Sequence, residues 1–79
     1  MAVNPVPLIF VRPGSRVRIV ELNAGFGLRR RLLQLGLAPG EVIEIIQNYG
    51  LVIIVRLANG ITLALSKGIA QKIYVELLV

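Results

Sequence analysis

The sequence contains no cysteine and no histidine, and its few acidic residues are all glutamate. Without cysteine there is no disulfide framework, no thiolate metal site and no thiol nucleophile. Without histidine there is no Ser-His-Asp triad and no imidazole ligand for a metal ion. These absences argue against an enzyme and against a transition-metal site built from a single chain.

Carboxylates are also scarce, because the sequence holds only four acidic residues. Glu41 and Glu44 are three residues apart in an expected strand, so they point to opposite faces and form no pair for acid–base chemistry. Nine Lys or Arg residues give a formal net charge of +5, which raises nucleic acid as a partner. The Phe and Tyr residues, however, lie in separate segments and form no platform for base stacking. Nucleic acid is therefore the less favoured partner.

Apolar residues are abundant, at 56% of the chain. A domain this small buries only about 60% of the surface of its unfolded chain, so part of its apolar surface should remain outside the core. The longest uncharged stretches, residues 1–11 and 45–55, are much shorter than the roughly 20 residues of a membrane-spanning helix. We therefore expect a cytoplasmic protein whose exposed apolar surface serves docking or homo-oligomer formation.

Residues 27–35 have the spacing of an amphipathic helix. Leu28, Leu32 and Leu35 fall at positions i, i+4 and i+7, which predicts that they face the core. Leu33 lies off that stripe and is the better candidate for an exposed contact.

The segment after this helix predicts a sharp stop. Gly36 is placed as the left-handed residue that ends a helix, and Leu37 can then fold back onto the last turn. Pro39 and Gly40 follow as a structural turn.

The other segments predict strands. Asn59-Gly60 is a strong hairpin signal that favours a type I′ turn. Ser66 can cap a single helical turn that precedes the last strand. The fold class is therefore mainly β: a small closed barrel of about five strands, with one inserted short α-helix and a one-turn helix before the last strand. The expected strands are residues 16–22, 41–47, 51–57, 61–65 and 73–77.

The N-terminal residues carry a weaker pattern. Pro5 and Pro7 favour extended backbone, so residues 1–7 are expected to form a flexible lead-in. Residues 8–11 could add an edge strand. Because the sequence shows no repeat, no low-complexity tract and no linker, residues 1–79 are expected to form a single domain.

Arg29, Arg30 and Arg31 are the most unusual charge cluster. They lie in the first turn of the predicted helix, where the helix dipole favours anions, at a cost of about 0.3 kcal/mol per cation. One interpretation is a solvated face whose arginine stems cover apolar surface. The other is an edge that binds an anion or a protein, and the sequence leaves both open.

The segment R-L-L-Q-L-G-L-A-P-G at residues 31–40 resembles the R-L-x-x-L-G-L-x-P-G motif of the FeoA family. The similarity extends to the leucine and Pro-Gly turn of residues 8–14 and to the closing pattern of residues 61–75. The resemblance implies an SH3-like β-barrel with an inserted helix. It also implies a cytosolic accessory that supports Fe(II) uptake by binding the cytoplasmic, nucleotide-binding part of the FeoB-type membrane transporter.

No residue of the sequence can be assigned as an iron ligand and no cofactor is expected, so a protein that supports iron transport should do so through contacts. An alternative is a small basic barrel that binds nucleic acid, and another is a regulatory or oligomerisation domain. We hypothesise that the helix and its stop present the protein-binding surface. Its candidate residues are Arg29, Arg30, Arg31, Leu33, Leu35, Gly36 and Leu37.

Overall fold

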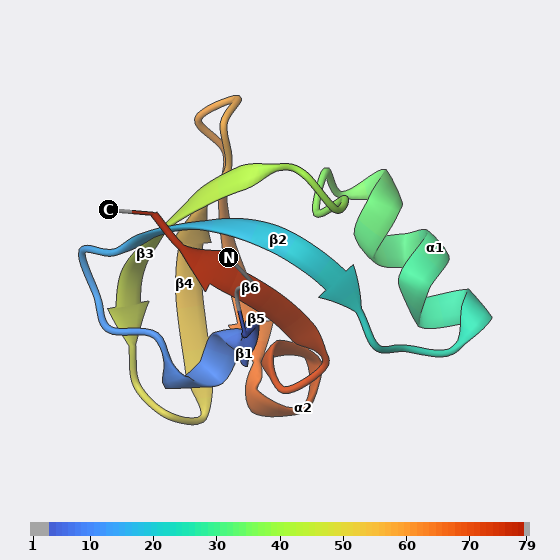
Figure 1. Cartoon of the computed structure of the whole chain (residues 1–79), viewed down its shortest axis with the longest axis horizontal. Coiled ribbons are helices and arrows are strands. Elements are labelled where there is room, and N and C mark those ends of the chain that lie inside the picture. Colours follow the sequence, from blue (N-terminus) through green and yellow to red (C-terminus); the bar gives the residue numbers. More distant parts are fainter. Residues whose placement is uncertain (1–3, 79) are drawn as a thin grey trace.

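Six strands of the computed structural model, which describes residues 4–78, form one antiparallel sheet in the order β1-β6-β2-β3-β4-β5 (Figure 1). The mainly β class is confirmed, together with the inserted helix and the one-turn helix before the last strand. The strands are β1 (Val6–Pro7), β2 (Arg16–Leu22), β3 (Val42–Asn48), β4 (Val52–Arg56), β5 (Thr62–Ser66) and β6 (Ile73–Leu77). The helices are the 3₁₀ helix η1 (Leu8–Phe10), α1 (Phe26–Gln34) and α2 (Lys67–Ala70).

Alternation along the strands builds the core. Side chains two residues apart in a strand point to the same face, and here that face is the inside of the curved sheet. Strands β2, β3, β4 and β6 each place two β-branched residues there, and none of these is more than 2% exposed. They are Val17, Ile19, Ile43, Ile45, Ile53, Val55, Ile73 and Val75.

Two irregularities bend the sheet into a barrel. The pairing of β2 with β6 shifts register between Ile19 and Glu21, and the pairing of β3 with β4 shifts between Ile45 and Gln47. An extra residue in one strand bends it and increases its twist. The barrel is closed by packing, because β1 and β5 remain the edges of the described sheet. At this opening η1 contacts β6, α2 contacts β4 and β5, and the two helices contact each other.

The N-terminal segment differs from the prediction. Residues 8–11 do not form an edge strand, because Leu8 turns fully into the core and the chain makes a 3₁₀ turn there. The strand lies earlier, where Val6 and Pro7 pair with Val75 and Tyr74 of β6. Of the predicted lead-in, residues 1–3 lie outside the described residues.

The hairpin between β4 and β5 is confirmed, but the predicted type I′ turn is wrong. Gly60 has a φ of +89°, whereas Asn59 does not have the positive φ that this turn requires. The Gly60 N–H donates to the Leu57 carbonyl (2.9 Å), and the Leu57 N–H donates to the Ile61 carbonyl (2.8 Å). This is a type I turn followed by a glycine bulge. The Asn59 side chain stabilises it by accepting from the Ile61 N–H at 2.9 Å.

One side chain ties the N-terminal segment to the sheet. The Asn48 amide nitrogen, at the end of β3, donates to the carbonyls of Ile9 and Val11, both at 2.9 Å. Its amide oxygen accepts from the Gly50 N–H, also at 2.9 Å. Asn48 therefore holds η1, β3 and the β3–β4 turn together.

We predict that Asn48→Ala lowers the free energy of unfolding by about 2 kcal/mol, because two carbonyls lose a partly buried donor. Asn59→Ala is the matched control, since it removes one exposed hydrogen bond and should cost about 0.5 kcal/mol. Urea denaturation of both variants measures the difference. Equal losses of unfolding free energy in the two variants would show that the hydrogen bonds of Asn48 to the N-terminal segment add no extra stability.

Candidate functional site

The end of α1 is fixed by a two-hydrogen-bond cap. Gly36 has a φ of +96°, its N–H donates to the Leu33 carbonyl (3.1 Å), and the Leu37 N–H donates to the Leu32 carbonyl (2.9 Å). These two bonds define a Schellman motif, which is usually accompanied by an apolar contact across the glycine. Leu32 and Leu37 provide buried side chains on the two sides of Gly36. The predicted helix stop is confirmed.

The Pro39-Gly40 turn then returns the chain to the sheet. Gly40 has a φ of +94°, and the Glu41 N–H donates to the Ala38 carbonyl at 3.0 Å, which together define a type II turn. The Gly40 N–H donates to the Ile19 carbonyl at 2.7 Å. This contact with β2 fixes where α1 stands relative to the barrel.

We predict that Gly36→Ala destabilises the protein by about 1 kcal/mol or more, because a side chain is strained at positive φ. A new Cβ would also lie 3.5 Å from the Leu57 side chain, which is ordinary contact, so the backbone conformation should dominate the cost. Gly27→Ala is the control within α1. A Cβ there meets open space, so this change should stabilise the helix by about 0.5 kcal/mol. Thermal or urea denaturation should therefore show opposite signs for the two variants.

The three arginines of α1 do not form one patch. Successive helical residues are about 100° apart around the axis, so Arg29, Arg30 and Arg31 point in three directions. The Arg29 guanidinium turns back to the barrel and donates to the Leu22 carbonyl at 3.4 Å. Arg30 shares the outer face of the helix with Phe26 and Leu33, which are four residues before it and three after it.

A shallow groove lies between α1 and β2, which we call the α1–β2 groove. Its volume is about 270 Å³. Apolar side chains dominate it, and the two charged residues that line it, Arg29 and Glu21, have opposite signs. The other lining residues are Val20, Leu22, Leu33 and Pro39.

A second groove lies beyond the end of the helix, where the helix stop approaches the β4–β5 hairpin. It also has a volume of about 270 Å³ and is lined by Gly36, Glu41, Leu57, Ala58 and Asn59. The structure thus brings Gly36, a predicted contact residue, beside Asn59, a predicted turn residue. Their proximity had no signal in the sequence.

The leucines of this region separate into buried and exposed residues. Leu33 is 44% exposed, as its position off the apolar stripe predicts. Leu35 is 43% exposed, so the prediction that it faces the core is wrong. Leu35 is the C-cap residue, one position beyond the end of α1. The chain then reverses at Gly36, and Leu37 takes the core position instead. Because Leu37 is 0% exposed, its place in the predicted contact surface is also wrong.

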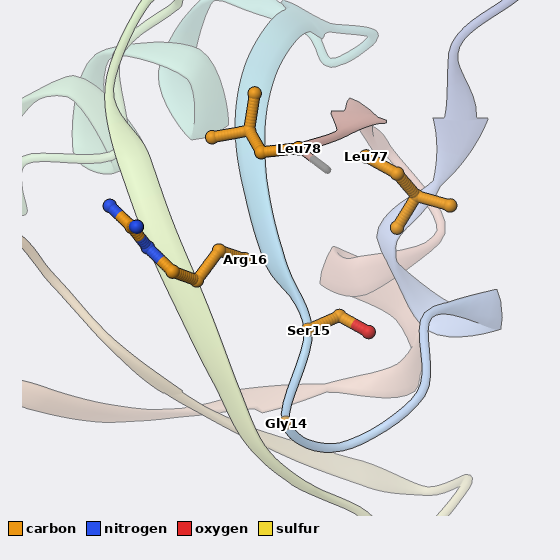
Figure 2. Close-up of a pocket in the computed structure, with 5 residues that line it drawn as sticks. All are labelled: Gly14, Ser15, Arg16, Leu77 and Leu78. Carbon is orange, nitrogen blue, oxygen red and sulfur yellow. The ribbon is translucent and has the colours of Figure 1, made fainter.

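A larger hollow lies elsewhere, between the start of β2 and the end of β6, with a volume of about 450 Å³ (Figure 2). It is lined by Gly14, Ser15, Arg16, Leu77 and Leu78. Figure 2 shows the Ser15 and Arg16 side chains pointing in different directions, so their polar groups do not converge on one point. Among these described lining residues, no nucleophile is paired with a base as acyl transfer would need.

Two of the carboxylates form ion pairs on the outside of the sheet. Glu76 pairs with Arg18 (3.1 Å) and Glu44 pairs with Arg56 (3.3 Å), each directly across neighbouring strands. Within residues 4–78 there is no group of three or more His, Cys, Asp or Glu residues that could hold a metal ion. In the same part of the chain, no helix has the length and apolar character needed to cross a bilayer.

Four strongly exposed apolar residues were not expected as surface features. Phe10, Phe26, Tyr49 and Leu51 are between 69% and 80% exposed. Their positions in or beside predicted turns could have indicated this exposure, because a turn has no strand or helix face that buries a large apolar side chain.

We predict that Leu32→Ala costs about 3 kcal/mol, because it opens a cavity under α1. Leu33→Ala removes the same atoms from a half-exposed side chain and should cost less than about 1 kcal/mol. Chemical denaturation compares the two neighbours. Similar losses would mean that Leu33 is a core residue and is not available for binding.

The fold defines a small SH3-like β-barrel that carries one inserted helix beside an apolar groove. The chain belongs to the FeoA family, because the model of the FeoA domain matches residues 6–77. A protein of Methanocaldococcus jannaschii named "Putative Fe(2+) transport protein A" is 33% identical over 70 residues, which cover 89% of this chain and 84% of the relative.

Solved structures agree with this assignment. The crystal structure of an "Iron Uptake Regulatory Protein (FeoA)" has a TM-score of 0.87 and 30% identity, and the match covers 95% of this chain and all of the other. The crystal structure of T. acidophilum IdeR has a TM-score of 0.84 and 24% identity. That match covers 99% of this chain but 36% of IdeR, so it shows a shared fold alone.

Proposed function

We propose that this protein is a non-catalytic accessory of ferrous iron uptake that binds the cytoplasmic, nucleotide-binding part of an FeoB-type transporter. Membership of the FeoA family supports the iron-uptake role, as does the name of the M. jannaschii relative. The proposal places the protein in the cytoplasm, at the inner face of the membrane through its partner.

The observation that carries the proposal is the outer surface of α1. Phe26 is 80% exposed and Leu33 is 44% exposed, and Arg30 lies between them on the same helix face. Val20, which is 39% exposed, continues this surface into the α1–β2 groove beside Arg29. Aromatic residues and arginine are enriched at protein interfaces and among the residues that dominate binding energy.

Arg29 is the cation in the first turn of α1; the prediction that all three arginines lie there is wrong, because α1 begins at Phe26 and Arg31 falls in its last turn. The N-cap residue Gly25 provides no side-chain hydrogen bond, and the first turn holds no acidic residue. The helix dipole therefore remains unfavourable for Arg29 in the free protein. Acidic groups of a partner would offset that cost, so we expect an acidic complementary surface on the transporter domain.

We predict that changing Arg29, Arg30 and Arg31 together to Gln weakens binding to the isolated cytoplasmic part of the transporter by about tenfold or more. The matched control changes Arg16, Arg56 and Lys72 to Gln, which removes the same charge away from α1. Calorimetric titration measures affinity, and uptake of radioactive Fe(II) by cells measures function. If the α1 triple variant bound and supported uptake like the control, this surface would not be the interface.

A salt titration tests nucleic acid as the alternative partner. Binding through about six phosphate contacts should weaken roughly 1,000-fold between 50 and 200 mM salt. A largely apolar protein contact should change much less over that range. Recovery of RNA, and of no membrane protein, in a co-purification from cell extract would contradict the proposed function.

A further inference from the structure

Three of the most exposed apolar side chains lie at one end of the barrel. Phe10 in η1 is 75% exposed, and Tyr49 and Leu51 in the β3–β4 turn are 69% and 73% exposed. Figure 1 shows η1, the β3–β4 turn and α2 together at the lower end, away from the β4–β5 hairpin at the top. We call Phe10, Tyr49 and Leu51 the turn-end residues.

The backbone beneath these side chains is held in place. Asn48 precedes Tyr49 and hydrogen-bonds the carbonyls on both sides of Phe10, those of Ile9 and Val11. The Lys67 N–H, at the start of α2, donates to the Leu51 carbonyl at 2.9 Å. The turn-end residues therefore project from linked elements, so their common exposure is built into the fold.

Positive charge accompanies these residues. Arg12 follows η1 and Lys67 begins α2, and both are exposed. None of the four glutamates lies in η1, the β3–β4 turn or α2, and two of them are paired with arginines on the strands. The turn end is thus apolar and cationic, and it complements an anionic surface.

The shape of this end favours a lipid bilayer as its partner. The turn-end residues stand on turns, and they line none of the three grooves described above. Aromatic side chains favour the headgroup level of a bilayer, and lysine and arginine beside them reach the lipid phosphates. Peripheral binding of this kind gains from buried apolar area and from attraction to anionic lipids together.

We propose that the turn end is a peripheral binding site for anionic lipid bilayers. Phe10, Tyr49 and Leu51 enter the boundary between headgroups and acyl chains, and Arg12 and Lys67 contact lipid phosphates. This site lies apart from the outer surface of α1 and does not depend on the function proposed above.

The first test uses the full chain and vesicles made of equal parts phosphatidylglycerol and phosphatidylcholine. Changing all three turn-end residues to Ser should lower the partition coefficient by about tenfold, because charge is unchanged while the inserted apolar surface is lost. The matched control changes three exposed apolar residues elsewhere, Phe26, Leu33 and Ile61, to Ser. It should bind vesicles like the unmodified protein. Denaturation curves check that both variants remain folded.

A second test locates the inserted residue directly, because the natural chain contains no tryptophan. Tyr49→Trp should show a blue shift of its emission and quenching by brominated acyl chains when the anionic vesicles are added. Ile61→Trp, in the hairpin at the opposite end, should show neither. Vesicles of phosphatidylcholine alone should give a much weaker response with Tyr49→Trp.

Three outcomes would overturn the proposal. Equal vesicle binding by the two serine variants would mean that net charge alone attracts the protein. An absence of binding, with the turn-end variant instead losing affinity for the transporter domain, would assign this end to a protein partner. Conversion of an oligomer to a monomer by the turn-end variant, again without lipid binding, would assign it to a second copy of the chain.

Discussion

The packing of eight β-branched side chains inside the barrel is the contact on which the rest of the structure depends. Strands β2, β3, β4 and β6 each contribute two of them, spaced by two residues and almost fully removed from water. Burial of this apolar area is the main favourable term in folding. The core also contains Leu8 of η1, Leu32 of α1 and Leu37, which follows the helix stop. A chain so rich in apolar residues must therefore place others outside.

Two sets of exposed apolar residues stand out, and others, such as Ile61 and Leu77, lie outside both sets. One set lies on the outer face of α1 and in the α1–β2 groove, and the other lies on η1 and the β3–β4 turn. Apart from Val20 on β2, both sets project from elements outside the barrel strands, where a side chain has no opposite face to pack against. Because the two sets are on different elements, the two contacts proposed above use different residues.

Much of the fold could be predicted from local patterns, because those patterns report burial directly. Alternation predicted the strands, and the positions of Gly36 and Ser66 predicted where each helix ends or begins; the Ser66 hydroxyl does accept from the Ile69 N–H at 3.4 Å. Two of the failures depend on tertiary contacts, whereas the wrong turn type at Asn59-Gly60 is a local one. Leu37 is buried in place of Leu35 because the chain reverses direction over the barrel. The α1–β2 groove was not predictable, since the bulge at Val20 sets which β2 side chains face outward.

The position of β6 has a consequence for how the chain acquires this shape. The strand lies between β1 and β2, so these two strands meet their shared neighbour only after β3, β4 and β5 have been made. Until then one edge of β2 and all of β1 have unpaired backbone groups, which can pair with another chain. Contacts of such large sequence separation also slow folding, because loop entropy is lost before they form. Closure of the barrel therefore waits for β6, and a nascent chain without β6 leaves these strand edges open to pairing with other chains.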